Sequence, residues 1–228
     1  MAALHGICSM ATRGVLDALA ATYALRTGVA VTFHAVGGVD AARRVSAGEI
    51  FDVVALASDA IDKLIAAGHL DANGKVDLVR SGVGVAVQAG AVRPDITTSE
   101  AVRQAVLAAR RVAYSTGPSG VALIALFERW GITAELHGRL LQAPAGVPVG
   151  MLVARGEADL GFQQMSELIG VEGIDLLGPL PDEIQITTVF SAAPGVAGTQ
   201  REAVRALLDF LVSADSADAK RRHGMEPA

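Results

Sequence analysis

The stretch "VAVTFHAVGGVDAARRVSAGEIFDVVALASDAIDKLIAAGH", residues 29–69, decides the fold. It predicts two strands, 29–36 and 51–57, each followed directly by a helix, 39–48 and 58–69. Gly48 is the predicted end of the first helix, and Ser58 is the predicted N-cap of the second. Because strands and helices alternate, the stretch predicts parallel strands with helices on both faces, which is an α/β fold.

The same alternation extends to both sides of this stretch. The strand "LHGIC" precedes it, and two long extended segments follow further along the chain. The remaining predicted elements, in chain order, are the strand 4–8, the helix 11–25, the extended segment 76–90, the helix 98–109, the strand 110–115, the helix after "STGPSG", the helices 133–140 and 147–156, the strands 158–163 and 173–180, the extended segment 184–193, and the helices 199–213 and 216–223.

The two long extended segments bracket a central α/β block. This arrangement predicts that the chain leaves one lobe, builds a second, and then returns. Lobe 1 is expected to contain residues 1–81 plus 190–228, and lobe 2 residues 82–189. The predicted architecture is therefore two Rossmann-like lobes joined by two crossover strands, with the ligand cleft between them.

The composition excludes several classes of protein. Hydrophobic residues make up 51% of the chain and charged residues 19%, which argues against disorder, and a net charge of -5 argues against nucleic-acid binding. The single cysteine, Cys8, excludes an intrachain disulfide, and the five histidines lack metal-ligand spacing. No apolar run reaches the length of a membrane span. We therefore expect no cofactor, no metal and no membrane insertion.

The first predicted strand begins only a few residues after Met1. The sequence as written therefore predicts a cytoplasmic protein without a signal peptide. The alternative is the mature form of an exported protein, which would be periplasmic and would serve an ABC permease.

Five loops rich in small residues stand directly before predicted helices: 8–14, 36–44, 57–63, 115–120 and 143–150. The first amide groups of a helix are unpaired and carry partial positive charge, so converging helix starts can bind an anion. The alternative is that the small residues only cap their helices. The predicted anion-binding residues in these loops are Ser9, Met10, Ala11, Gly37, Gly38, Val39, Ser58, Ser119, Gly120 and Val147.

Three polar residues outside these loops complete the predicted ligand-binding set. Arg80 and Ser81 lie where the chain crosses between lobes, and an arginine there can form two hydrogen bonds with a carboxylate. The alternative for Arg80 is an ion pair with Asp77 or another acid. Gln164 follows Gln163 at a strand-to-helix turn, where a glutamine either contacts the ligand or caps the turn.

Signatures of several enzyme classes are absent from the sequence. There is no G-x-S-x-G nucleophile elbow, no Walker A motif, and no G-x-G-x-x-G after the first strand. The candidates for an acid–base group are His34, Tyr114 and Asp40. Cys8 would need activation that the sequence does not display.

Four segments resemble the periplasmic molybdate-binding protein family. They are "ARRVSAGEIFDVVALAS" after "VGG", then "GPSGVALIALFERWG", "GEADLGFQQMSEL" and the closing "AKRRHGM". The resemblance covers essentially the whole chain in order. It implies the type 2 periplasmic-binding fold, a two-lobed clamshell that closes on a small ligand.

The sequence departs from that family at its ligand-binding positions. Molybdate-binding members have serine-rich loops and a tyrosine, whereas this chain has only Ser9 in the first loop, Gly37–Val39 in the second, and Gln164 at the tyrosine position. A tetrahedral oxyanion needs rigid hydroxyl and N–H donors, so the departures favour a larger organic anion, a di- or tricarboxylate.

The same branch of the fold includes chains that look like aconitate isomerase. The resemblance implies, as an alternative function, an allylic proton shift between cis- and trans-aconitate. A third alternative is a cytoplasmic ligand sensor or a subunit that supplies a partner.

Overall fold

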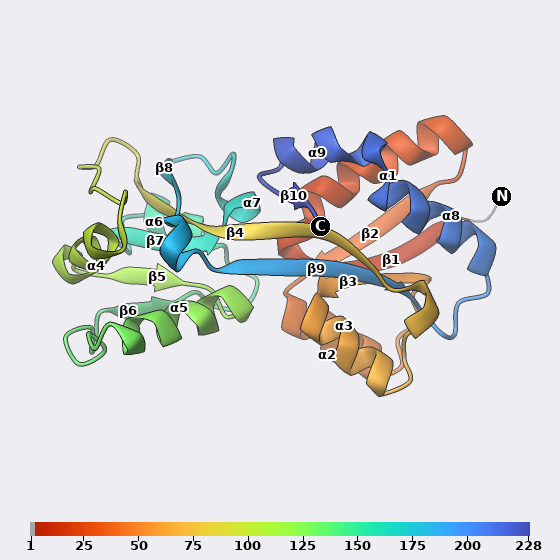
Figure 1. Ribbon diagram of the computed structural model, residues 1–228, viewed down its shortest axis with the longest axis horizontal. Helices are drawn as coiled ribbons and strands as arrows, with labels where there is room; N and C mark the ends of the chain where they lie inside the picture. The colour runs from red at the N-terminus through yellow and green to blue at the C-terminus, as the bar shows by residue number, and fades with distance from the viewer. Residues whose placement is uncertain (1–2) are drawn as a thin grey trace. The chain divides into compact units, whose positions relative to one another are not determined.

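The computed structural model describes residues 3–228, and the chain divides into two compact units. Unit 1 contains the residues up to Ser81 together with Thr188–Ala228, and unit 2 is the continuous segment Gly82–Thr187. The chain passes between the units within β4 (Val76–Gln88) and again at β9 (Thr187–Pro194) (Figure 1).

The sheet of unit 1 has three parallel strands in the order β2 (Val31–Val36), β1 (Leu4–Ser9) and β3 (Val53–Ala57). β9 pairs antiparallel with β3, and β10 (Glu226–Pro227) pairs antiparallel with β4. Every residue of β3 is buried, as in strands covered on both faces. Val53 and Ala55 belong to one hydrophobic cluster, whereas Val54 and Leu56 belong to another.

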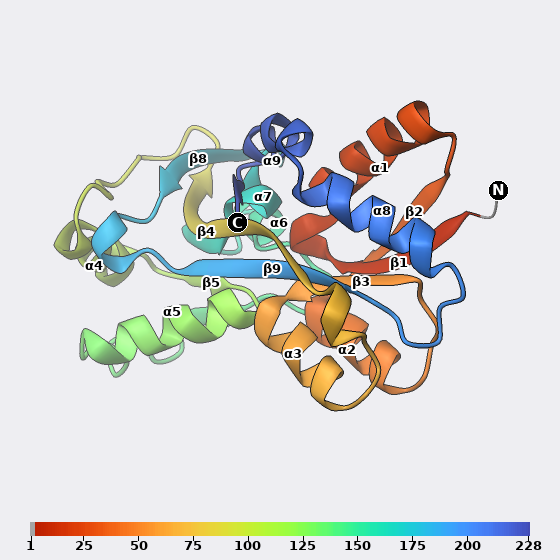
Figure 2. The same ribbon diagram turned by 45° about the vertical axis from the view of Figure 1, so that its right-hand side comes forward.

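Helices cover both faces of this sheet, as Figures 1 and 2 show. α1 (Arg13–Thr27) and α8 (Arg201–Val212) supply buried leucines to the first cluster, and α2 (Gly38–Ser46) and α3 (Ser58–Ala66) supply apolar side chains to the second. The remaining short helices are η1 (Met10–Thr12), η2 (Ala72–Gly74), η4 (Ala214–Ser216) and α9 (Ala217–Arg222).

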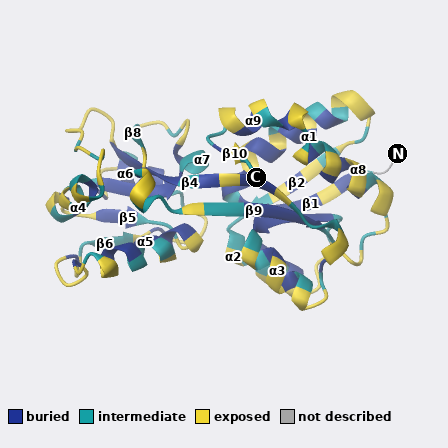
Figure 3. Ribbon diagram, viewed as in Figure 1, coloured by how far each residue is buried: buried dark blue, intermediate teal, exposed yellow. Residues whose placement is uncertain are grey.

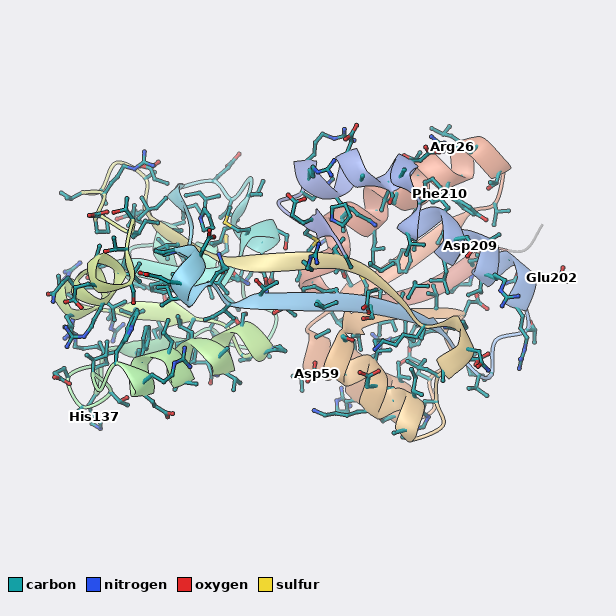
Figure 4. The ribbon with its side chains drawn as sticks, viewed as in Figure 1. Arg26, Asp59, His137, Glu202, Asp209 and Phe210 are labelled. Carbon is teal, nitrogen blue, oxygen red and sulfur yellow. The ribbon has the colours of Figure 1, made fainter. Side chains whose placement is uncertain are left out.

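A cation–π contact and an ion pair join α1 to the C-terminal part of unit 1. The guanidinium of Arg26 lies 5.5 Å from the ring centroid of Phe210, and Nη1 of Arg26 lies 2.5 Å from Oδ2 of Asp215. Figure 4 labels Arg26 and Phe210, which come from α1 and α8. The contact stacks a cation on an aromatic ring at the surface, where such pairs contribute about 0.5–1 kcal/mol.

The sheet of unit 2 has the order β4, β7 (Leu160–Gln164), β5 (Val112–Tyr114) and β6 (Leu140–Gln142). β7, β5 and β6 are parallel, while β4 pairs antiparallel with both β7 and β8 (Ile174–Pro179). The helices of unit 2 are α4 (Ser99–Ala108), α5 (Pro118–Arg129), α6 (Val149–Ala154), α7 (Met165–Leu168) and η3 (Asp182–Ile184).

Two separate clusters form the core of unit 2. Val85, Val106, Phe127 and Phe162 belong to the larger one, and α6 contributes Val153 to the smaller one. In each unit the strands are mostly buried, and the outer faces of the helices are exposed (Figure 3). The α/β fold predicted from the alternating pattern is therefore confirmed.

One predicted helix is wrong. Residues 133–139 form turns, and the next three residues form β6, which pairs with β5. Gly138 has a φ of 74°, in the left-handed region that ends a helical turn. The short apolar run Leu140–Leu141 suits a helix or a strand equally, and the free edge of β5 decides in favour of the strand.

Candidate functional site

Three loops meet at one edge of the unit 1 sheet. β1, β2 and β3 are parallel, so their carboxyl ends lie at the same edge, and Ser9 is in register with Val36. Each strand runs directly into a helix, η1, α2 or α3. We call this group of strand ends and helix starts the unit 1 edge. Ligands of α/β sheets bind at such edges.

The first loop of the unit 1 edge is built around Ser9. Ser9 is 6% exposed and is the N-cap of η1, with its backbone extended at ψ 155°. Its hydroxyl lies 3.4 Å from the hydroxyl of Thr12, which donates to the carbonyl of Ser9 at 3.2 Å. The first amides of a helix have no intrahelical acceptor, so Met10 and Ala11 present N–H groups beside a fixed hydroxyl.

The second loop lies beside the first. Gly37 is the N-cap of α2, and a Cβ added to Gly38 would lie 3.7 Å from Cβ of Ser9. The structure therefore brings together two predicted site residues that are far apart in the chain, Ser9 and Gly38. Val39, in the first turn of α2, is 69% exposed, so an apolar side chain borders these amides.

The third loop does not match the prediction that Ser58 caps its helix. Ala57 is the N-cap of α3, and Ser58 is the first helical residue. The hydroxyl of Ser58 accepts a hydrogen bond from Nζ of Lys75 at 2.9 Å, so it is already engaged. Asp59 follows in the first turn (Figure 4) and pairs with Lys63 at 3.5 Å. In this loop, the amides of the first turn of α3 are therefore the groups suited to bind an anion, and the hydroxyl of Ser58 is not.

Unit 2 has a comparable edge, at the carboxyl ends of β5, β6 and β7 and the starts of α5, α6 and α7, which we call the unit 2 edge. Gly117 is the N-cap of α5, and Pro118 is its first residue. The hydroxyls of Ser115 and Ser119 lie 3.1 Å apart, and Ser119 is 6% exposed. A Cβ on Gly120 would lie 1.9 Å from the carbonyl oxygen of Ser115, so only glycine fits this turn.

The structure corrects the prediction for Val147. The predicted helix start lies two residues too early, because α6 begins at Val149 with Pro148 as its N-cap. The amide of Val147 donates to the carbonyl of Pro144 at 3.0 Å, so this amide belongs to a turn and is not an unpaired helix start. Gln164 ends β7, is the N-cap of α7 and is 3% exposed.

Arg80 lies on β4 opposite Glu226 of β10. Its side chain is exposed, and Nη2 donates to the carbonyl of Pro227 at 3.0 Å. The predicted alternative was an ion pair with Asp77 or another acid, and among residues 3–228 Arg80 forms no ion pair, while Asp77 accepts from the hydroxyl of Ser191 at 2.6 Å. Ser81 follows with no exposed surface.

The weak acid–base candidates lie in unremarkable surroundings. His34 is exposed on β2, an edge strand. Asp40 pairs with Arg43 one turn later on α2. Tyr114 is half-buried and packs against the larger core cluster of unit 2. Desolvation by burial raises the pKa of the Cys8 thiol to about 12, so the reactive thiolate is not formed at neutral pH.

Sequence reasoning missed a carboxyl group at the unit 2 edge. Nε2 of Gln163 donates to Oε1 of Glu167 at 2.9 Å, while Oε1 of Gln163 accepts from the amide of Val149 at 2.9 Å. Desolvation by burial raises the pKa of Glu167 to about 7, partly offset by the hydrogen bond from Gln163. The four-residue spacing of Gln163 and Glu167 was visible in the sequence, but burial, which raises the pKa, was not.

Two features are absent from residues 3–228. No group of three or more His, Cys, Asp or Glu side chains in this range has the geometry of a metal site. None of the helices described here is long and apolar enough to cross a membrane.

Each of the two α/β units has helix starts along the carboxyl edge of its sheet, which is where open α/β sheets bind their ligands. The chain belongs to the family of bacterial extracellular solute-binding proteins, whose model matches residues 4–226.

A relative with an assigned activity is an aconitate isomerase from Pseudomonas sp. It is 40% identical over 220 residues, which cover 94% of this chain and 84% of the relative. This similarity extends across both units.

Solved structures confirm the type 2 periplasmic-binding fold. The periplasmic molybdate-binding protein of Azotobacter vinelandii has a TM-score of 0.81 at 19% identity, covering 97% of this chain and 98% of that protein. The sulfate-binding protein of Mycobacterium tuberculosis H37Rv has a TM-score of 0.81 at 16% identity, covering 100% of this chain and 88% of that protein. At these identities the likeness establishes the fold.

Proposed function

We propose that this protein binds a small organic polycarboxylate, with aconitate as the first candidate, through the loops of the unit 1 and unit 2 edges. The observation that carries the proposal is the closeness of Ser9 and Gly38 at the starts of η1 and α2, where a Cβ added to Gly38 would lie 3.7 Å from Cβ of Ser9. Two helix starts close to one another favour the binding of an anion. At exposed positions each helix start stabilises a nearby negative charge by about 0.3–1 kcal/mol.

The side chains around these amides favour a carboxylate over a metal oxyanion. The second loop has no hydroxyl group, and Ser9 shares its hydroxyl contact with Thr12. Met10 is partly exposed and Val39 largely exposed beside the amides. A ligand with a hydrocarbon skeleton gains from such apolar neighbours, whereas a small inorganic oxyanion does not.

At the unit 2 edge we propose Ser119, Gly120 and Gln164 as further ligand-binding residues. The hydroxyl of Ser119 is fixed by Ser115, and Gln164 can donate and accept. Arg80 uses one guanidinium nitrogen on Pro227, so its other donors remain for a carboxylate. We also retain Ser81, which is buried next to Arg80.

A second candidate function is isomerisation of the bound aconitate. The observation that favours it is the 40% identity to an aconitate isomerase over 94% of this chain. In that reaction a proton leaves one carbon of the substrate and returns to another, so the double bond moves.

The family description supports a proposed location outside the cytoplasm. In a bacterium with two membranes this would be the periplasm, where a solute-binding protein passes its ligand to an ABC permease. In that case binding alone would be the function.

Titration calorimetry tests the binding proposal. We expect cis-aconitate, trans-aconitate or citrate to bind, and molybdate, tungstate and sulfate not to bind. Ser9→Ala should weaken carboxylate binding roughly tenfold or more, since a hydrogen bond to a charged group contributes about 1.5–3 kcal/mol. Ser46→Ala, at the exposed far end of α2, is the matched control and should bind like the wild type.

Two results would contradict the proposal. Tight binding of molybdate with no binding of any carboxylate would reject the ligand class. Unchanged carboxylate affinity in Arg80→Ala would show that Arg80 does not bind the ligand and serves only to hold β10 against β4.

A further inference from the structure

The carboxyl group of Glu167 has a defined place at the unit 2 edge. Glu167 lies on α7, immediately after β7, and its Oε1 accepts from Gln163. Gln163 is 4% exposed and also accepts from the first amide of α6. The hydrogen bonds from Val149 to Gln163 and from Gln163 to Glu167 therefore hold the carboxyl group at a fixed position relative to the start of α6, at the unit 2 edge.

In the part of the chain that the structure describes, no basic group pairs with this carboxyl group. Within residues 3–228, no Lys, Arg or His forms an ion pair with Glu167, and its Oε2 accepts no hydrogen bond. α7 packs mainly on β7, α6 and β8, and Met165 of α7 also lies against Gly84 of β4, within a stretch (Gly82–Gln88) that has no titratable residue. β7 and α6 contain no titratable residue, and β8 contains Asp175, whose Oδ2 accepts from the amide of Gly90 at 3.2 Å. One oxygen of Glu167 is thus held while the other is available for a proton.

A second polar atom in the same turn has no protein partner. Oγ of Ser166 is buried and makes no hydrogen bond within the described residues. A buried hydroxyl without a partner is uncommon in folded proteins and needs an explanation, which can be a functional role, local strain or a bound water or ion. Ser166 and Glu167 are adjacent on α7, so two groups capable of hydrogen bonding are both left incomplete by the protein itself.

We propose that Glu167 is the catalytic acid–base group that moves a proton between two carbons of the bound polycarboxylate. This inference rests on the second candidate function, the isomerisation of aconitate. It supplies the acid–base group that His34, Tyr114 and Asp40 do not provide.

The proposed step conserves atoms and electrons. The Glu167 carboxylate removes a proton from the saturated CH₂ of aconitate, breaking a C–H bond and forming an O–H bond. The electron pair of the broken C–H bond spreads over the allylic carbons and the adjacent carboxylates. Glu167 then returns the proton to the far carbon of the allylic unit, and the double bond is left one position away. No oxidant, reductant or further reactant is needed.

The acid–base properties of Glu167 suit both halves of this step. Its pKa is raised to about 7, chiefly by desolvation. A group that is partly ionised near neutral pH can both accept and return a proton efficiently. Gln163 keeps the same hydrogen bond in either state, because its NH₂ group can donate to a carboxylate or to a carbonyl oxygen.

The test follows isomerisation of cis-aconitate by proton NMR in deuterium oxide, with the wild type, Glu167→Gln and Glu172→Gln. General acid–base catalysis contributes about 10²–10⁴-fold, so Glu167→Gln should lose at least 100-fold in kcat and lose deuterium incorporation at the allylic carbons. Glu172→Gln, an exposed carboxylate five residues later, is the control and should match the wild type. Calorimetry should find aconitate affinity within about threefold of the wild type in both variants.

The pH profile of kcat provides a readout that does not depend on any variant. Wild-type kcat should fall as the pH drops below about 7, because the base form of Glu167 is then lost. Glu167→Asp, which keeps the carboxyl group on a shorter side chain, should restore part of the activity. It also serves as the test if Glu167→Gln does not fold, as judged by circular dichroism.

Each contrary outcome has a distinct meaning. Wild-type activity in Glu167→Gln, or a kcat that is flat through pH 7, would overturn the role of Glu167 and leave the proposed function intact. If the wild type binds aconitate but gives neither isomer nor deuterium exchange, the inference and the isomerase function fail, while the binding function stands. If no carboxylate binds, the proposed function itself fails.

Discussion

At the residue scale, Lys220 of α9 shows how tertiary burial changes a charged side chain. It is 2% exposed and lines a small apolar cavity with Thr12, Leu16 and Val79. No ion pair joins it to any carboxylate among residues 3–228. Desolvation by burial lowers its pKa, because the charged form loses hydration without gaining a counter-ion.

We predict that Lys220→Met stabilises the protein at neutral pH. Methionine keeps an unbranched apolar side chain in the same space and removes the cost of burying the charge. Below the lowered pKa of the folded state, Lys220 is charged in both the folded and the unfolded state, and the full cost of burying the charge applies. As the pH rises from that pKa toward the pKa of the unfolded state, the folded protein buries a neutral amine and the cost shrinks. Urea unfolding of both proteins across this range measures the difference, and the advantage of Lys220→Met should shrink at high pH. A less stable Lys220→Met at every pH would show that the amine has a favourable partner.

Burial also shifts the pKa of Glu167, but it raises the pKa of this acidic side chain, whereas it lowers that of Lys220. A carboxyl group whose folded pKa is raised to about 7 binds a proton in the folded state that the unfolded state releases near pH 4.5. Its contribution to stability therefore falls as the pH rises through this interval.

We predict that Glu167→Gln is more stable than the wild type above pH 7, by at most about 3 kcal/mol, and that this advantage decreases toward pH 5. Chemical denaturation at both pH values measures the difference. The amide can still accept from Gln163, so the local network is kept. A stability difference that does not change with pH would contradict the raised pKa.

At the element scale, the strand and helix pattern was largely readable, whereas helix starts were not. The sequence identified β3, α1 and the long strand β4 because their apolar periodicity is strong. It misplaced the N-cap of α3 by one residue and the start of α6 by two, since Ala57 and Pro148 give weak capping signals. These errors matter for function, because the amides of helix starts form the candidate site.

Two glycines at helix starts give a matched prediction. Gly120→Ala should destabilise the fold by roughly 1–3 kcal/mol, because its Cβ would meet a backbone oxygen at 1.9 Å. Gly38→Ala should be neutral or stabilising by up to about 1 kcal/mol, because its nearest neighbour lies at an ordinary 3.7 Å. Urea unfolding compares the two variants. Equal stability would mean that the turn around Ser115 relaxes to accept a side chain.

At the scale of the whole molecule, each unit has its own hydrophobic core. The two core clusters of unit 2 contain only residues of the continuous segment Gly82–Thr187, whereas unit 1 is assembled from two separate segments. The sequence suggested this division through the long extended segments that became β4 and β9.

We predict that the segment 82–187, produced alone, folds cooperatively, because its sheet and its hydrophobic clusters need no residue of unit 1. Circular dichroism and urea denaturation should show mixed α/β structure and a single transition. The segment 1–81 alone should not fold, because β9 and α8, which complete the sheet and core of unit 1, are missing. An unfolded 82–187 segment would show that the unit depends on unit 1.

The sequence by itself determined the α/β class, the order of the main elements and the family resemblance, because periodicity and turn residues are local properties of the chain. Tertiary structure alone decided that Ser9 meets Gly38, that Ser58 is engaged by Lys75, and that Arg80 binds the carbonyl of Pro227. It also decided that burial raises the pKa of Glu167 to about 7 and that Lys220 is buried without an ion pair among residues 3–228. These properties depend on which distant segments pack together and on the water they exclude, and spacing along the chain does not encode either quantity.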